Sequence, residues 1–232
     1  MNLVNWDVLA RYGPRMLEGL LVTIELVAIS VAIGALLAFP VAFARTSRIA
    51  PLRWASFGYS YFFRGTPLLA QTFLVYYGAG QFRPELQAVG LWWFFRDAFL
   101  CCLLTFTLNT AAYQAEILKG ALSSVPLGQR EAAMSLGLSR WTAFRHVILP
   151  QALLIALRPF GNEIILMIKG SAVAAIVTVF DLMGATRLAY ARSFDFQVYL
   201  WAAVLYLALV ETIRRIWDRL ERRMTRHLRR AH

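Results

Sequence analysis

An unbroken apolar run at residues 20–44 constrains the possible folds of this chain more than any other feature. Glu25 is the only ionisable residue among its 25 positions. At about 1.5 Å per residue, a helix of this length reaches roughly 37 Å, enough to cross the roughly 30 Å hydrocarbon core of a membrane with some tilt. The run is much longer than the roughly 7–15 residues of a signal-peptide core, and no basic cluster immediately precedes it. Residues 20–44 therefore predict a membrane-spanning helix that is not cleaved off.

Further apolar stretches complete the prediction of an all-α integral membrane protein with about five transmembrane helices. The other spans are expected at residues 66–80, 98–118, 153–179 and 198–213, within a single domain that covers residues 1–232. The stretch at 66–80 is short for a spanning helix, and the aromatic-rich residues 54–63 are expected to lengthen it on its N-terminal side. The hydrophobic fraction of 59% agrees with this prediction, since soluble proteins average about 45–50%.

Lys and Arg residues gather on one side of the predicted spans. Three stretches, which follow spans one, three and five, hold 17 of the 24 basic residues. The positive-inside rule places these stretches in the cytoplasm, so we expect the N-terminus outside and the C-terminus inside. The net charge of +11 is then a topology signal with anionic membrane lipid as its partner. Nucleic acid is not expected as a partner, because no aromatic-interleaved binding module accompanies the charge.

Residues 123–150, between spans three and four, predict two short cytoplasmic helices joined by a turn. Residues 131–136 are rich in good helix formers, and Gly137 can supply a left-handed C-terminal residue. Ser139 can cap a second helix, which we expect to end at Pro150 because proline restricts the residue before it. Such a compact unit has the shape needed to dock into a groove of another protein, and a surface loop without a binding role is the alternative for this pattern alone.

The same segment resembles the "EAA" signature of ABC importer permeases. The resemblance rests on Glu131-Ala132-Ala133, then Gly137, and finally Val147-Ile148-Leu149-Pro150. Other motifs resemble the polar amino-acid family, with the closest likeness to permeases for histidine, for lysine, arginine and ornithine, and for the opines octopine and nopaline. These motifs are Arg64-Gly65-Thr66-Pro67-Leu68, Leu108-Asn109-Thr110-Ala111-Ala112-Tyr113, Ala115-Glu116-Ile117 and Asn162-Glu163. The resemblance covers nearly the whole chain.

This resemblance implies a permease subunit that is not an enzyme, has no catalytic residues and holds no metal or cofactor of its own. Its implied partners are a homologous second permease, a dimer of ATPases that binds ATP and Mg, and a periplasmic solute-binding protein. The sequence supports that division of labour, since it contains no glycine-rich phosphate loop ending in Gly-Lys-Ser or Gly-Lys-Thr. The family's coupling helix sits in an ATPase cleft, and the matching residues here are Glu131, Ala132, Ala133, Gly137, Leu149 and Pro150.

The implied cargo is a polar, basic amino acid (histidine, arginine, lysine or ornithine) or an opine. The implied process is alternating-access transport from periplasm to cytoplasm by a multi-pass protein of the bacterial inner membrane. A secondary transporter without an ATPase is the alternative. Such transporters often contain inverted repeats with broken helices in matching halves. Five spans cannot divide evenly and the sequence shows no such repeat, which favours the ABC importer.

Polar side chains inside the predicted spans are candidates for the substrate path, because exposing them to lipid is costly. Asn109, Tyr113 and Glu116 share one face of span three, at offsets of four and three residues. Asn109 and Tyr113 lie deeper in the span and are the better candidates. Glu116 lies near the cytoplasmic end, so interfacial solvation or a structural hydrogen bond explains it as well as substrate contact does.

Span four carries a second polar group at Asn162 and Glu163. The preceding Pro-Phe-Gly at residues 159–161 is expected to weaken the helix, and such breaks often border a binding cavity. Glu163 is our preferred ligand for the cationic head group of the cargo. An internal ion pair with Arg158 or Lys169 is the alternative, although neither spacing is the favoured three or four residues.

Overall fold

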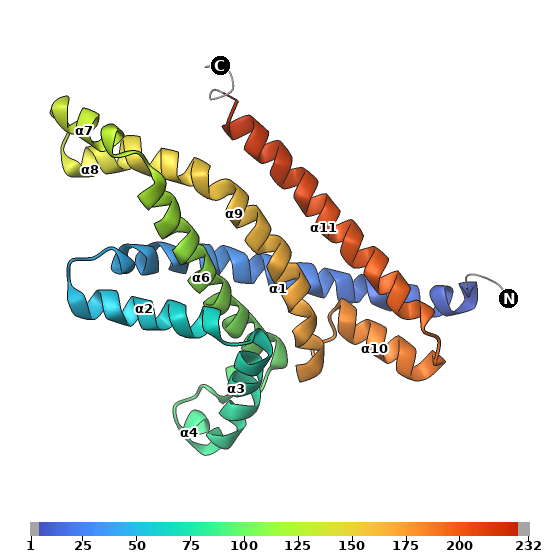
Figure 1. Cartoon of the computed structure of the whole chain (residues 1–232). Coiled ribbons are helices and arrows are strands. Elements are labelled where there is room, and N and C mark those ends of the chain that lie inside the picture. The colour runs from blue at the N-terminus through green and yellow to red at the C-terminus, as the bar shows by residue number, and fades with distance from the viewer. Residues whose placement is uncertain (1–4, 227–232) are drawn as a thin grey trace.

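The computed structural model describes residues 5–226, whose regular structure is entirely helical (Figure 1). The α-helices are α1 (Trp6–Arg45), α2 (Ala50–Gly65), α3 (Leu68–Gln81), α4 (Arg83–Ala88), α5 (Trp92–Phe95), α6 (Ala98–Ser124), α7 (Leu127–Ser135), α8 (Arg140–Ala143), α9 (Leu149–Gly170), α10 (Leu182–Ser193) and α11 (Gln197–Met224). A π-helix, η1 (Phe144–Ile148), joins α8 to α9, and a 3-10 helix, η2 (Ser171–Val177), follows α9.

Four helices of the described chain are long and apolar enough to cross a membrane. They are α1, α6, the continuous helix Arg140–Val177, and α11. The spans predicted at 20–44, 98–118, 153–179 and 198–213 fall on these four helices. The span predicted at 66–80 falls on α3, whose 14 residues reach only about 21 Å. Helix α3 is not among the four, so the fifth span stays a prediction.

Helix α6 forms the centre of the bundle and lies against α1, α2, α3 and α9 (Figure 1). Its buried surface includes Ala111, Ala112 and Ala115, none of which is exposed. On the facing side of α1, an added Cβ at Gly34 would stand 2.5 Å from Cγ2 of Thr110. Small residues let helices approach closely in a membrane, where packing rather than the hydrophobic effect drives their association. These small residues therefore allow α1 and α6 to approach each other closely.

The chain leaves the helical conformation between α2 and α3. Thr66 and Pro67 are both extended, with ψ angles of 148° and 134°. Proline has no N–H and disfavours a helical conformation at the residue before it, so the break follows from Pro67. Residues 54–63 therefore lie in a separate helix, α2, and do not extend α3 as one continuous helix. Figure 1 shows that α2 and α3 run in different directions.

Helix α8 continues through η1 into α9, so the predicted helix end at Pro150 is wrong. Pro150 lies in the first turn of α9, directly after the π-helix. A π turn uses wider i→i+5 bonding, and this accommodates a residue that has a bulky ring and lacks an N–H. Because of the π-helix, α8 and α9 form one continuous helix where the sequence predicts a break.

Residues 159–161 do not weaken α9, which is also contrary to the prediction. The helix continues past its internal proline to Gly170, where it gives way to η2. The indole of Trp217, on α11, fills the space beside Gly161, since an added Cβ there would stand 2.4 Å from its Cδ1. Trp217 Nε1 also donates a hydrogen bond to the Leu157 carbonyl at 2.7 Å. Contact with α11 therefore supports α9 where its sequence suggests a break.

The N-terminal part of α1 packs against α10 and the start of α11. Tyr12 is buried there in a cluster with Ala189 and Val198. Asn5 Nδ2 donates to Asp195 Oδ2 at 3.0 Å, which fastens the start of α1 to the turn between α10 and α11. Helix α1 is therefore 40 residues long because it includes this packed extension as well as the predicted span.

Candidate functional site

Helices α7 and α8 form the predicted helix–turn–helix. Gly137 has a φ of +74°, in the left-handed region that favours glycine. The N–H of the next residue, Leu138, donates to the Ala133 carbonyl at 3.2 Å and closes the end of α7. Ser139 Oγ accepts from the Thr142 N–H at 3.1 Å and caps α8. The turn at Gly137 and the cap at Ser139 are therefore confirmed.

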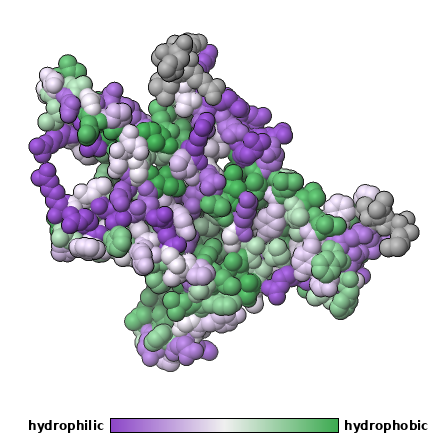
Figure 2. Space-filling view, viewed as in Figure 1, coloured by the Kyte–Doolittle hydropathy of each residue, from purple (hydrophilic) through white to green (hydrophobic). Residues whose placement is uncertain are grey.

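The tip of this helix–turn–helix presents apolar side chains to solvent. The most exposed are Leu127 (72%), Met134 (53%), Leu136 (79%) and Trp141 (67%). Figure 2 shows hydrophobic residues at the tip of this end of the molecule, which otherwise carries many hydrophilic ones. Outside the membrane, where the sequence predicts this segment, a cluster of large exposed apolar side chains marks an interaction surface.

The structure divides the six residues expected to couple the chain to an ATPase. Three are exposed at the tip, namely Glu131, Ala132 and Gly137. Ala133 is 3% exposed and faces inward. The last two, Leu149 and Pro150, stand beyond the π-helix at the start of α9, where Leu149 packs on the core. Only the first three can therefore touch a docked protein at the tip.

A cavity of about 680 Å³ separates the helix–turn–helix from the ends of α1 and α6. Phe43 and Leu122 line it on the bundle side, and Trp141 and Phe144 line it on the other. Arg130 Nη2 reaches across to the Leu122 carbonyl at 3.2 Å. Beside the cavity, Phe144 and Ile148 pack against Ala42 and Leu122 of the bundle, so the segment is also anchored there.

Asn109 stabilises the break between α2 and α3 from inside the bundle. Its Nδ2 donates to the Phe63 carbonyl at 2.9 Å and to Gln71 Oε1 at 3.0 Å. Gln71 Nε2 in turn donates to the Phe63 carbonyl at 2.9 Å and to Thr66 Oγ1 at 2.7 Å. Away from water, backbone groups that a helix break frees must find partners within the protein. The two amides provide these partners, and Asn109 is only 7% exposed.

Tyr113 contacts the same break at its outer edge. Its hydroxyl donates to the Arg64 carbonyl at 3.4 Å, and the Arg64 guanidinium lies 5.3 Å from the centre of the tyrosine ring. Asn109, Tyr113 and Glu116 thus share one face of α6, as predicted. In this structure that face meets α2 and the start of α3.

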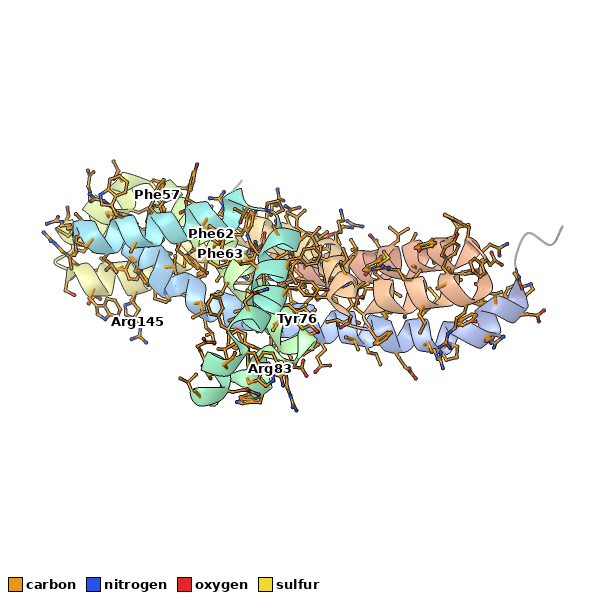
Figure 3. All side chains as sticks on the ribbon, turned by 90° about the horizontal axis from the view of Figure 1, so that it is seen from below. Phe57, Phe62, Phe63, Tyr76, Arg83 and Arg145 are labelled. Carbon is orange, nitrogen blue, oxygen red and sulfur yellow. The ribbon has the colours of Figure 1, made fainter. Side chains whose placement is uncertain are left out.

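Glu116 lies at the centre of a charged cluster between α1, α2 and α6. Its carboxylate oxygens lie 2.6 Å from Arg45 Nε, 3.5 Å from Lys119 Nζ and 3.9 Å from Arg64 Nη1. The Arg45 guanidinium also lies 4.9 Å from the centre of the Phe57 ring, which Figure 3 labels on α2. The carboxylate therefore joins three helices, which agrees with a structural role for Glu116.

Glu163 points into the subunit and is 5% exposed. Thr110 Oγ1 donates to Glu163 Oε1 at 3.0 Å. Gln114 Nε2 donates to Thr110 Oγ1 at 3.0 Å and to the Val31 carbonyl at 3.3 Å. The chain of bonds connects α9 to α6 and α1 through hydroxyl and amide groups.

The internal ion pair predicted as an alternative for Glu163 is not observed. Arg158 Nε pairs instead with Glu221 Oε1 on α11 at 2.7 Å. Between residues 5 and 226, no carboxylate oxygen lies within 4.0 Å of Lys169 Nζ. Arg158, Asn162 and Lys169 are all exposed and form a polar stripe on the outer side of α9, while Glu163 lies inside the subunit.

Four polar residues complete these networks without standing out in the sequence, namely Arg45, Gln71, Thr110 and Gln114. A weak signal exists for two of them, because Gln71 and Gln114 are amides within otherwise apolar helices and such groups need partners. The identity of each partner depends on which helices come together. Sequence spacing within one helix does not supply that information.

Comparison with known proteins supports the assignment of the chain to a family. Residues 30–226 match the family described as binding-protein-dependent transport system inner membrane component. The chain is 38% identical to the nopaline transport system permease NocM of Agrobacterium fabrum over 204 residues, which cover 88% of this chain and 85% of that protein. It is 38% identical to the histidine/lysine/arginine/ornithine permease HisM of Escherichia coli over 224 residues, which cover 96% and 94%.

Solved structures agree with this match. A crystal structure of an amino acid ABC transporter with histidines gives a TM-score of 0.84 at 32% identity, covering 95% of this chain and 99% of that one. An inward-facing structure of the methionine ABC transporter MetNI gives a TM-score of 0.74 at 22% identity, covering 91% and 96%, which shows the shared fold. The resemblance indicated by the motifs around Glu131 and Asn162 is thereby confirmed. The chain belongs to the inner-membrane components of binding-protein-dependent transport systems, the permease subunits of ABC transporters.

Proposed function

We propose that this permease imports a basic amino acid or an opine from the periplasm into the cytoplasm, as one of two permease subunits in an ATP-driven complex. The observation that carries the proposal is the similarity along nearly the whole chain. The relative named for nopaline and the relative named for histidine, lysine, arginine and ornithine are both 38% identical to it. These compounds share a carboxylate, and the amino acids among them carry a basic side chain.

The partner ATPases bind ATP and Mg, and one of them receives the α7–α8 tip. Exposed Leu136 and Trp141 supply apolar contact area, and Glu131 supplies a charge at the same tip. Such contacts are typical of a protein interface, where buried aromatic anchors contribute most of the affinity. With this tip in the cytoplasm, the N-terminus of the chain lies outside and the C-terminus inside. The binding protein then docks at the opposite end of the bundle, near α4, α5 and α10.

Movement of the tip reaches the membrane through one long helix. Helices α8, η1 and α9 are continuous, so a displacement imposed by the ATPases is carried to Asn162 and Glu163. A cavity of about 680 Å³ lies between the tip and the ends of α1 and α6. In this mechanism the binding and hydrolysis of ATP shift the pair of permeases between outward-open and inward-open states.

The substrate path follows the exposed polar face of α9 at Asn162, and the second permease closes its other side. Glu163 is the neighbouring residue and accepts a hydrogen bond from the neutral Thr110 hydroxyl. A cationic substrate group forms a stronger, charge-assisted bond with a carboxylate, so it can replace Thr110 when α9 moves. Asn109, Tyr113 and Glu116 contribute by stabilising the α2–α3 break that borders the path.

Uptake by the complete complex tests this proposal. The two permeases, the ATPase pair and the binding protein are reconstituted in vesicles with ATP and Mg on the ATPase side. Labelled histidine, arginine, lysine, ornithine, octopine and nopaline are then supplied in turn. We expect ATP-dependent uptake of at least one of them, and Glu163→Gln should reduce uptake of a cationic substrate while leaving expression unchanged. Uptake that needs an ion gradient and no ATPase would instead support a secondary transporter.

A further inference from the structure

The C-terminal part of α11 carries arginines that have no acidic partner in the described chain. Four of them are exposed, namely Arg219, Arg222, Arg223 and Arg226. No carboxylate between residues 5 and 226 lies within 4.0 Å of any of their guanidinium groups. Figure 2 shows hydrophilic residues over this end of α11. Positive charge that the chain itself leaves unbalanced attracts an anionic partner.

The two preceding arginines of the same helix are neutralised. Arg214 Nε lies 2.8 Å from Glu211 Oε2, and Arg214 Nη1 lies 3.2 Å from Asp218 Oδ2. Arg215 Nε lies 2.6 Å from Glu211 Oε1. The four unpaired arginines are therefore a separate feature and not simply part of an arginine-rich tail.

The unpaired arginines share a groove with apolar side chains. The groove measures about 540 Å³ and is lined by Ile216, Arg219, Leu220, Arg222, Arg223 and Arg226. At about 100° per residue, these six positions occupy an arc of roughly 160° around the helix. Ile216 is 52% exposed and Leu220 is 40% exposed. One ligand can therefore meet both guanidinium groups and aliphatic carbon on this face.

The length of α11 places this groove at a membrane surface. The helix has 28 residues and reaches about 42 Å, which is about 12 Å more than the hydrocarbon core. Tyr199 and Trp201 lie near its start, as aromatic residues do at the outer interface. The last two turns of α11 then leave the hydrocarbon on the side that the positive-inside rule makes cytoplasmic. Ile216 and Leu220 fall at the edge of the acyl chains, and the arginines fall among the headgroups.

We propose that this face of α11 binds the phosphate groups of anionic phospholipids in the cytoplasmic leaflet. The planar guanidinium matches phosphate oxygens with two parallel hydrogen bonds. Clusters of at least four basic residues directly after a spanning helix are typical of sites for anionic lipid. Ile216 and Leu220 favour lipid over a free anion or an acidic protein surface, because only a lipid brings acyl chains to the same groove.

A lipid bound here also stabilises the contact between α11 and α9. Trp217 and Glu221 belong to the same helical turns as the arginines but face α9. Trp217 Nε1 donates to the Leu157 carbonyl at 2.7 Å, and Glu221 Oε1 lies 2.7 Å from Arg158 Nε. Headgroups that fix these turns therefore fix the residues that support α9, so anionic lipid should raise the Tm of the complex.

The first test measures lipid next to the groove in the complete importer. Thr212 is exposed one turn before Ile216, and Thr212→Cys carries a fluorophore after the two native cysteines are replaced by alanine. The complex is placed in nanodiscs of dioleoylphosphatidylcholine that contain a small fraction of spin-labelled phosphatidylglycerol or spin-labelled phosphatidylcholine. Quenching gives the binding constant of phosphatidylglycerol relative to phosphatidylcholine. We expect a ratio of about ten or more, since each basic residue near an anionic surface contributes about fivefold.

Two double variants separate a site from general charge. Arg219→Gln with Arg223→Gln should bring the ratio close to one. Arg214→Gln with Arg215→Gln removes the same charge from the neutralised positions and should keep most of the preference. An equal loss in both double variants, or a ratio near one in the unaltered complex, would overturn the proposal. Loss of the preference on addition of about 10 mM inorganic phosphate would assign the arginines to a free anion and would overturn it as well.

The second test uses the Tm of the complex and the retention of its ATPases. Nanodiscs with phosphatidylglycerol should give a higher Tm than nanodiscs of phosphatidylcholine alone, and Arg219→Gln with Arg223→Gln should remove most of this difference. The same variant should keep its ATPases on purification. Loss of the ATPases with an unchanged lipid preference would show that the arginines meet an acidic surface of the ATPase and not a phospholipid.

Discussion

Gly34 determines how closely α1 approaches α6. An added Cβ would stand 2.5 Å from Thr110 Cγ2 and 3.3 Å from the backbone nitrogen of Ala111, and a backbone atom cannot move aside easily. Gly34→Val should therefore lower stability by about 1–3 kcal/mol, as overpacking of a close contact does. The Tm of the purified permease measures this. Gly58→Val is the control, because nothing lies within 4 Å of a Cβ at Gly58, and an equal Tm for both variants would contradict the close contact.

Glu116 balances three cations on neighbouring helices. Without its negative charge, Arg45, Arg64 and Lys119 would repel one another at the point where α1, α2 and α6 meet. The Glu116 side chain is 18% exposed, so the cost of Glu116→Gln should fall between that of surface and buried ion pairs, at about 1–3 kcal/mol. Thermal unfolding of the purified permease is the measurement. Glu211→Gln, which removes a carboxylate from pairs on the surface of α11, should change the Tm less.

The α7–α8 element depends on one left-handed residue. Gly137 has a φ of +74°, and a β-branched residue in that conformation costs about 1–3 kcal/mol. Gly137→Val should therefore redirect α8 while the chain still inserts into the membrane. The altered tip should lose the ATPases on purification or allow ATP hydrolysis without uptake, as measured by the ratio of ATP hydrolysed to substrate imported.

Gly120→Val provides the matched control for this change. Gly120 lies within α6, and nothing lies within 4 Å of an added Cβ. The control should keep both the ATPases and the coupled uptake. Normal coupling in Gly137→Val as well would show that the geometry of the turn is not needed for docking, which would remove the main structural support for the role of the tip.

The ends and interruptions of the helices show which parts of the structure the sequence can predict. The turn after α7 depends on local chemistry, a glycine and a capping serine, so Gly137 and Ser139 predict it correctly. Proline is harder to interpret, because its effect depends on neighbours. A preceding π turn accommodates Pro150, and the indole of Trp217 supports α9 beside Gly161. Neither influence is visible in the segment that contains the proline.

The candidate site follows the same division between local and long-range information. Hydropathy singles out Asn109, Glu116 and Glu163 as polar groups in apolar helices, and all three are engaged in networks. Their partners come from other helices, at separations of 46, 71 and 53 residues. Only the packing of α6 against its neighbours decides which hydroxyl, amide or guanidinium each one meets. Sequence therefore indicates that a network exists, and the fold determines its members.

At the scale of the whole molecule, α2 and α3 decide how many times the chain crosses the membrane. Helix α3 alone reaches only about 21 Å. However, the amides of Gln71 and Asn109 satisfy backbone groups at the break, which allows a bent crossing made of α2 followed by α3. With the four long helices, this bent crossing makes up the five spans that the sequence predicts. An odd number places the two ends of the chain on opposite sides.

Labelling of single cysteines tests this arrangement. Cys101 and Cys102 are buried and are first replaced by alanine, and then one cysteine is introduced at Arg11 or at Arg223, both exposed. In spheroplasts a membrane-impermeant thiol reagent should label Arg11→Cys at once and Arg223→Cys only after the membrane is opened, because the basic residues near Arg223 stay in the cytoplasm. The cysteine-free chain must give no signal. Equal labelling of both sites in closed spheroplasts would mean an even number of crossings, and α2 and α3 would then not form a span.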